Sequence, residues 1–326
     1  MTTPSRNDTA RGPLRLGTRR SQLAMAQSGM VAEMVREVTG RDVELVEITT
    51  FGDVSREALA RIGGTGVFVS ALRDALLAGE IDLAVHSLKD LPTAAPEGLV
   101  LAAIPPRADP RDALVARDGL RFAELPAGAK VGTGSPRRMA QLNAWARAHD
   151  LHIETVPIRG NVDTRIGYVT SGTLDAVVLA AAGLQRIGRL TEASELIDAD
   201  VCLPAPGQGA LAVECAGSDP ELAAQLAELD DPFTRAAVTA ERSLLAALEA
   251  GCSAPVGALA DLMADGQTSE LRLRGVVGTT DGTSLVQMST TGPVPASDDE
   301  ARALGRELAA SMLAKGAAGL MGEHTL

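Results

Sequence analysis

The feature of this sequence that most constrains its fold is an alternation of short apolar stretches with amphipathic ones. LRLGT at 14–18 is followed by apolar residues at helical spacing over 21–38, and the order repeats through VELVEIT (43–49), the helical pattern at 67–77 and IDLAVH (81–86). The last stretch is almost continuously apolar, which is typical of a parallel strand covered on both faces. The first part of the chain therefore predicts an α/β domain.

A second alternation of the same kind follows. Its pieces are DALVAR (112–117), KVGTG (130–134), a helical pattern over 136–149, IETVPI (153–158) and LDAVVLA (174–180). The stretch before it, AIPPRADPRD, carries three prolines, as expected of a connection between domains. We predict a second α/β domain.

The pattern of apolar and polar residues changes at Asp231. One long amphipathic pattern reaches residue 250, and GCSAPVG, the strand-like RLRGVV and SLVQMST, and a last helix from Asp298 follow it. This predicts a smaller α+β domain. The stretch PAPGQGALAVEC (204–215) could belong to either neighbour on spacing alone.

Composition excludes some classes of partner. Hydrophobic residues make up 45% of the 326 residues and aromatic ones 2%, so the core has to be aliphatic. A net charge of −12 argues against nucleic acid and against an anionic membrane surface as partners. The segment from Lys130 to Leu190, however, contains eight Lys and Arg but four Asp and Glu. This local excess of positive charge predicts an anion-binding site.

The beginning of the chain and its cysteines indicate a compartment. MTTPSRNDTARG has no apolar core of a secretion signal, and no apolar run approaches the ~20 residues of a bilayer span, so we expect a cytoplasmic protein with a disordered leader at 1–13. Cys202, Cys215 and Cys252 are odd in number and lack metal-type spacing. A disulfide framework and a metal site are not expected.

HSLKDLP (86–92) follows a predicted strand at its carboxyl end, where open α/β sheets place their ligand sites. Asp90 is the candidate acid there, although an aspartate at such a junction is often only a turn residue. His86 is more often a hydrogen-bonded structural residue than a base.

Basic residues recur at turns after predicted strands. A helix amino end and guanidinium groups both favour carboxylates or phosphates, whereas any one such turn could be a solvated helix start. Together these turns predict one anion-binding cleft. Their residues are Arg19 with Ser21, Arg137 and Arg138 in GTGSPRR, Arg159 and Arg165 in RGNVDTR, and Arg186.

Two further features each allow two interpretations when they are taken alone. GGTGVF (63–68) is either an anion-cradling turn or a flexible loop, and it lies between Arg61 and the rare aromatic Phe68. Cys252 follows a long helix, whose carboxyl end disfavours a thiolate, so it is either a small buried thiol or a cysteine alkylated once by an electrophile.

Nine segments of the sequence, taken together with their order along the chain, closely resemble the porphobilinogen deaminase family. The resemblance spans about 14–257 and implies two domains like those of periplasmic solute-binding proteins facing across a cleft, with a third domain carrying a cofactor cysteine. It implies domain 1 at 14–105 with 208–227, domain 2 at 110–204 and domain 3 at 231–326. The segments are TRRSQLA (18–24), TTFGD (49–53), GGTGVF (63–68), HSLKD (86–90), GTGSPRR (132–138), RGNVDTR (159–165), LAAAGLQR (179–186), PAPGQGA (204–210) and GCSAPVG (251–257).

The resemblance implies an activity in tetrapyrrole and heme biosynthesis. Four porphobilinogen units would be joined head to tail on a dipyrromethane held covalently by Cys252, with loss of ammonia, and water would release hydroxymethylbilane. Asp90 would stabilise the positive charge that develops on the pyrrole and could move protons. Phe68 would be a pyrrole neighbour or a gate, and the enzyme would be a monomer.

The acetate and propionate groups of cofactor and substrate would be bound, by the same resemblance, by a set of cationic and polar residues. These are Arg19, Ser21, Arg61, Lys89, Ser135, Arg137, Arg138, Arg159, Arg165, Arg186 and Gln208.

Thr65 and Gly134 stand where many family members have lysine and serine, so we expect the carboxylate contact of that lysine to be absent. Two other readings stay open: a solute-binding module without catalysis, which shares the expected architecture but does not need Cys252, and a cysteine-dependent hydrolase or acyltransferase. The second lacks a persuasive partner among His86, His149, His152 and His324.

Overall fold

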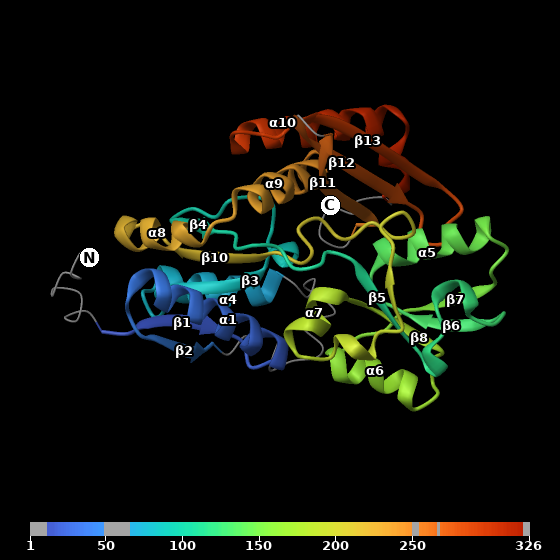
Figure 1. Ribbon diagram of the computed structural model, residues 1–326, viewed down its shortest axis with the longest axis horizontal. Helices are drawn as coiled ribbons and strands as arrows, with labels where there is room; N and C mark the ends of the chain where they lie inside the picture. The colour runs from blue at the N-terminus through green and yellow to red at the C-terminus, as the bar shows by residue number, and fades with distance from the viewer. Residues whose placement is uncertain (1–11, 49–65, 250–253, 266–267, 322–326) are drawn as a thin grey trace. The chain divides into compact units, whose positions relative to one another are not determined.

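The computed structural model describes residues 12–48, 66–249, 254–265 and 268–321 (Figure 1). It contains three sheets, two of five strands and one of three. The chain divides into two compact units, Met1–Arg107 with Ala210–Pro232, and Ala108–Gly209 with Phe233–Leu326. Helices and strands alternate in the first two sheets and segregate in the third, which confirms the predicted α/β class with a smaller α+β part.

The first unit is built on a sheet of order β2-β1-β3-β10-β4. Strand β1 is parallel to β2 and β3, while β10 runs antiparallel between β3 and β4. The strands are β1 (Leu14–Thr18), β2 (Val43–Glu47), β3 (Leu83–Ser87), β4 (Leu99–Ala103) and β10 (Leu211–Ala216), and the helices are α1 (Gln22–Thr39), α4 (Gly66–Leu77) and α8 (Pro220–Leu226).

The core of this unit is aliphatic, as the scarcity of aromatic residues predicts. Leu16 of β1, Leu83 of β3 and Val213 of β10 are fully buried and belong to one cluster with Val31 and Val35 of α1. Burying such a side chain stabilises the fold by about 1.5–3 kcal/mol. Helix α1 therefore covers the face of the sheet from which these strands project their apolar residues.

The second unit contains a sheet of order β7-β6-β8-β5-β9. Strand β6 is parallel to β7 and β8, and β5 runs antiparallel to β8, so the fourth strand is reversed in both five-stranded sheets. The elements are β5 (Asp112–Ala116), β6 (Ala129–Gly132), α5 (Pro136–Ala148), β7 (Ile153–Val156), α6 (Val162–Thr170), β8 (Ala176–Ala180), α7 (Ala181–Arg186) and β9 (Glu195–Ile197).

The third sheet is an antiparallel meander with two helices packed on it. Leu244 of α9, Leu273 of β12, and Leu308 and Met312 of α10 are fully buried in a common cluster. The elements are α9 (Pro232–Ala247), β11 (Val256–Asp265), β12 (Thr268–Gly278), β13 (Leu285–Pro293) and α10 (Asp298–Ala314).

The stretch 204–215, whose place the spacing left open, is divided between the units. Residues up to Gly209 belong to the second unit, and Ala210 begins the segment that forms β10 in the first. Strands β4 and β9 were not predicted from the sequence. The finer division into three domains stays a prediction.

A tight turn within this divided stretch depends on two glycines. Gly207 and Gly209 have φ of 77° and 91°, a region that side chains rarely adopt. A Cβ on Gly209 would lie 2.6 Å from the carbonyl oxygen of Ala108. Backbone conformation and space therefore both require glycine at 209.

We expect Gly209→Ala to lower the free energy of unfolding of the second unit by about 2–4 kcal/mol, because a left-handed backbone and an overpacked contact add. Gly172→Ala is the matched control, since its φ is 73° but no atom lies within 4 Å of the added Cβ. It should cost about 1–2 kcal/mol. Thermal and urea unfolding measure both, and equal losses would contradict the steric argument.

Candidate functional site

The predicted ligand residues of the first unit lie at one edge of its sheet. Arg19 directly follows β1 and Ser21 caps α1, while Lys89 and Asp90 lie in a short 3-10 helix, Leu88–Asp90, after β3. Because β1 and β3 are neighbouring parallel strands, their carboxyl ends meet at the same edge. The structure thus gathers these residues there, as the sequence predicts.

Asp90 is presented by an anchored turn. The N–H of Leu88 donates to the carbonyl oxygen of Ala210 at 3.0 Å, and the N–H of Leu91 donates to the carbonyl oxygen of Leu88 at 3.1 Å. The Leu88 side chain is fully buried. The half-buried carboxylate of Asp90 has no hydrogen-bond or ion-pair partner among the described residues. It is available to a cation or to N–H donors of a ligand.

A buried ion pair lies inside the same sheet. The Arg73 guanidinium of α4 donates from Nη2 and Nε to the two carboxylate oxygens of Glu214 on β10, at 2.7 and 3.0 Å. His86 Nε2 of β3 is 3.1 Å from Glu214 Oε2, and the Glu214 side chain is 2% exposed. Burial alone would raise the pKa of Glu214, but hydrogen bonds from His86 and Arg73 outweigh it and lower the pKa to about 2. His86 is thus a structural partner, as the alternative reading proposed.

In the second unit, the paired arginines begin helix α5. Ser135 caps this helix by accepting a hydrogen bond from the Arg138 N–H at 3.5 Å, and Pro136 occupies its first turn. Arg137 and Arg138 follow at once, only 3% and 5% exposed. The expected helix start is confirmed, but it is buried and not solvated.

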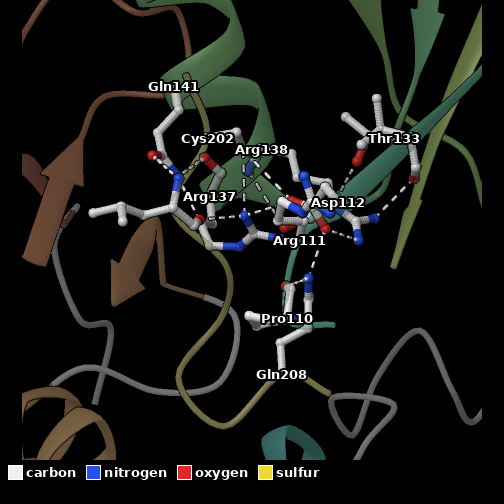
Figure 2. A network of polar contacts seen from close by, with 12 residues as sticks. Pro110, Arg111, Asp112, Thr133, Arg137, Arg138, Gln141, Cys202 and Gln208 are labelled. Atoms are coloured by element: carbon white, nitrogen blue, oxygen red, sulfur yellow. Dashed lines mark hydrogen bonds and ion pairs between the residues drawn. The ribbon is translucent and has the colours of Figure 1, made fainter. Parts of the chain in front are cut away.

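Arg137 and Arg138 share one internal counter-anion, Asp112 (Figure 2). Asp112 Oδ2 accepts from Arg137 Nη1 at 2.8 Å, and Oδ1 accepts from Arg138 Nη2 at 2.7 Å. Gln208 Nε2 donates to Oδ1 as well, at 2.8 Å. Although burial alone would raise the pKa of Asp112, the two guanidinium groups hold it far below its usual range. The cluster of two bases and one acid carries a net positive charge.

Arg165 and Arg186 are in a different electrostatic position. Arg165 Nε donates to the carbonyl oxygen of Gly160 at 2.8 Å, and Arg186 Nη2 to that of Gly209 at 2.6 Å. Neither has a carboxylate partner within the described ranges. Burial lowers the pKa of Arg186 to about 10, and burial followed by repulsion from Arg138 lowers the pKa of Arg165.

These cations define what the second unit can bind. Partly buried guanidinium groups without a counter-anion are stabilised by a bound anion, and their planar forks suit carboxylates. Arg159 is exposed in the turn between β7 and α6, the helix that carries Arg165. The donor set therefore fits a ligand that carries several acid groups.

Some predicted site residues fall outside the described part of the chain. Arg61 and Cys252 lie in the ranges 49–65 and 250–253, and Phe68 is placed in α4 without a described side chain. Thr65 lies outside the described residues too.

Sequence reasoning missed Asp112 and Glu214. Asp112 is separated from Arg137 and Arg138 by 25 and 26 positions, and Glu214 from Arg73 by 141. Both acids lie on the reversed fourth strand of their sheets. The only local signal was an acidic residue in an otherwise apolar strand.

No cluster of three or more His, Cys, Asp or Glu in the described ranges could hold a metal ion. None of the helices in those ranges combines the length and the apolar character needed to cross a bilayer.

Two family profiles match the chain. The profile described as "Porphobilinogen deaminase, dipyromethane cofactor binding domain" matches residues 14–224, and "Porphobilinogen deaminase, C-terminal domain" matches residues 235–314.

Similar proteins cover almost the whole chain. "Porphobilinogen deaminase 1" of Streptomyces avermitilis is 77% identical over 95% of this chain and 98% of its own length, and "Porphobilinogen deaminase" of Thermobifida fusca is 59% identical over 94% of each. Among solved structures, an "ABC transporter / periplasmic binding protein from Brucella ovis with glutathione bound" is 16% identical, with a TM-score of 0.40 over 74% of this chain and 70% of its own.

The buried Glu214 pair predicts a pH dependence of stability. Because the pKa of Glu214 falls from 4.5 to about 2 on folding, its contribution is complete above about pH 4.5 and is lost as pH falls towards 2. Glu214→Gln should therefore be less stable than the parent at pH 7, by about 3 kcal/mol, and the difference should shrink through this window.

Urea unfolding at a series of pH values measures this difference. Glu47→Gln is the control, because its pair with Arg20 is exposed and such pairs contribute little. A gap between parent and Glu214→Gln that stays constant from pH 7 to pH 2 would contradict the prediction.

Proposed function

The chain belongs to the porphobilinogen deaminase family, and from this premise we propose that Cys252 holds its dipyrromethane covalently and that Asp90 is its catalytic acid group. The enzyme is a hydroxymethylbilane synthase, a transferase of tetrapyrrole biosynthesis. It joins porphobilinogen units head to tail with loss of ammonia and releases hydroxymethylbilane by hydrolysis. When bound, the dipyrromethane would supply the pyrrole carbon to which the first unit is joined, and each later unit would be joined to the one before it.

The observation that carries the proposal for Asp90 is its uncompensated carboxylate on an anchored turn. A half-buried negative charge without a partner among the described residues can accept hydrogen bonds from pyrrole N–H groups. It can also stabilise positive charge that develops beside it, because it is oriented before the reaction begins. The same oxygen atoms can accept a proton from a reacting carbon.

The basic residues have the complementary role. We assign Arg165 and Arg186 to acetate and propionate groups, since both are partly buried without a counter-anion in the described ranges. Arg137, Arg138 and Gln208 would contribute from the Asp112 cluster, and Ser135 from the start of α5.

The remaining residues of the predicted set are proposed as site residues on the strength of the family resemblance alone. They are Arg19, Ser21, Arg61, Lys89 and Arg159 as carboxylate ligands, and Phe68 as a pyrrole neighbour.

We further propose that the enzyme works as a monomer in the cytoplasm. Cys202 and Cys215 support the compartment, because both are buried free thiols. Burial raises the pKa of Cys202 to about 12 and that of Cys215 to about 11, so neither competes with Cys252 as an attachment point.

Covalent attachment predicts a mass increment. Purified protein should exceed its chain mass by two linked porphobilinogen-derived units and give the Ehrlich colour of a dipyrrole. Cys252→Ser should show neither, because no thioether can form at that position. Intact-protein mass spectrometry under denaturing conditions measures this directly.

Cys215→Ala is the matched control and should keep the full increment. Active parent protein at the bare chain mass, or a Cys252→Ser variant that retains the increment, would reject the assignment.

Asp90→Ala should fold normally but lose turnover by at least about a hundredfold, because the developing positive charge loses its counter-charge. Since the side chain has no partner among the described residues, its removal should change the Tm little. Steady-state kinetics and thermal unfolding test the two halves of the prediction.

Asp74→Ala provides the control for net charge, because Asp74 is exposed on α4 and its removal changes the charge equally. Near-normal turnover in Asp90→Ala, or an equal loss in Asp74→Ala, would overturn the role.

A further inference from the structure

The Asp112 cluster carries an inference that rests on the proposed function and goes beyond it. We propose that Asp112 is a positioning residue for the reaction: its carboxylate fixes Arg137, Arg138 and Gln208 in one arrangement that lets them bind acid groups. Asp112 is not among the residues that the sequence or the family resemblance singles out.

The topology places Asp112 where it can act on ligand-binding residues. Strand β5 is antiparallel to β8, and Asp112 at its start pairs with Ala180 at the end of β8. The amino end of β5 therefore lies at the edge where β6, β7 and β8 have their carboxyl ends. Helices α5, α6 and α7, with the predicted arginines, begin after those ends.

The carboxylate joins side chains from two separate segments. Its oxygens accept three hydrogen bonds of 2.7–2.8 Å, from Arg137 and Arg138 of helix α5 and from Gln208 of the turn after residue 205. Asp112 is fully buried, so water does not compete for these bonds. Figure 2 shows the side chains converging on it from opposite sides.

Each of the three partners is held at a second point as well. Arg137 Nη1 also donates to the carbonyl oxygen of Leu203 at 2.6 Å, Arg138 Nη1 to that of Val178 at 2.8 Å, and Gln208 Nε2 to that of Pro110 at 2.7 Å. Two anchors fix the plane and direction of a guanidinium group, which a single contact would leave free to rotate. Asp112 is the anchor that all three share.

The charge of the cluster suits the same role. One carboxylate between two guanidinium groups makes their burial tolerable but leaves an excess positive charge. That excess acts on its surroundings, because repulsion from Arg138 helps to lower the pKa of Arg165. An acid group bound near Arg138 and Arg165 would relieve it.

A purely structural ion pair makes a different prediction from a positioning residue. Loss of a structural pair lowers the stability and the amount of folded enzyme, but leaves the KM of the folded fraction unchanged. Loss of a positioning residue changes the orientation of the bases, so binding of an anionic substrate weakens. The readouts that separate them are KM and cofactor retention.

The test is Asp112→Asn in the full chain, with porphobilinogen as the substrate. The amide keeps the shape but lacks the charge and replaces one acceptor by a donor that faces other donors. We expect KM to rise about tenfold or more with a smaller change in kcat. Intact mass should show a smaller fraction of chains carrying the dipyrrole than in the parent.

Cys202→Ala is the matched control. Its Sγ lies in the same cluster, 3.3 Å from Arg137 Nη1 and 3.5 Å from Asp112 Oδ2, but it is a weak neutral donor and no ligand in the proposal. Its KM and dipyrrole fraction should equal those of the parent. Asp112→Asn with parental KM and dipyrrole fraction, whatever its Tm, would overturn the proposal.

Two further variants complete the design. If Asp112→Asn does not fold, Asp112→Glu keeps the charge but displaces it; KM should then rise at least threefold, and an unchanged KM overturns the proposal.

Arg186→Gln tests the proposed function itself. A raised KM in Arg186→Gln with parental KM in the Asp112 variants rejects only the positioning role, whereas parental KM in all of them rejects arginine binding of carboxylates as well.

Discussion

The arrangement of this enzyme depends on acids buried beside bases on the reversed strands of its sheets. Asp112 on β5 and Glu214 on β10 each bind an arginine from a helix, and both are at most 1% exposed. A buried carboxylate is tolerated only with such partners, and removing one partner leaves an uncompensated charge at a cost of about 3–5 kcal/mol. These pairs therefore fix where α4 and α5 lie on their sheets, and the ends of those sheets carry the candidate site.

The basic residues differ in how their charge is balanced, and this difference organises the site. Arg137 and Arg138 share the carboxylate of Asp112, so their charge is partly compensated and one net positive charge remains on the cluster. Arg165 and Arg186 donate to backbone oxygens and have no carboxylate partner among the described residues, so their charge is available to an anionic ligand. Asp90 in the first unit is the opposite case, a carboxylate without a cation in the described ranges. The family's reaction brings both an acid-bearing chain and a developing positive charge, which these two kinds of group complement.

Local pattern was enough to predict most elements and the family, but not the long-range partners. The strands β1, β3, β6 and β8 and the helices α1, α5 and α10 lie where the sequence pattern indicated, and the resemblance to porphobilinogen deaminases is confirmed. Strand β10 could not be assigned to a unit, because its partners β3 and β4 are more than a hundred residues earlier. For the same reason Asp112 was overlooked: nothing local in ADPRDALV distinguishes a turn acid from one that compensates two arginines. The positions of Cys252 and Arg61 remain predictions of the family resemblance.

The place of β10 in the first sheet has a consequence for the order of folding. Because β4 is joined to the rest of that sheet through β10, the sheet cannot be completed before residue 216 has been synthesised. The sheet of the second unit has all its strands once Ile197 has emerged from the ribosome. The five-stranded sheet that is begun first is thus completed after the second one, and during synthesis β3 and β4 expose backbone edges that a nascent chain must keep from pairing elsewhere.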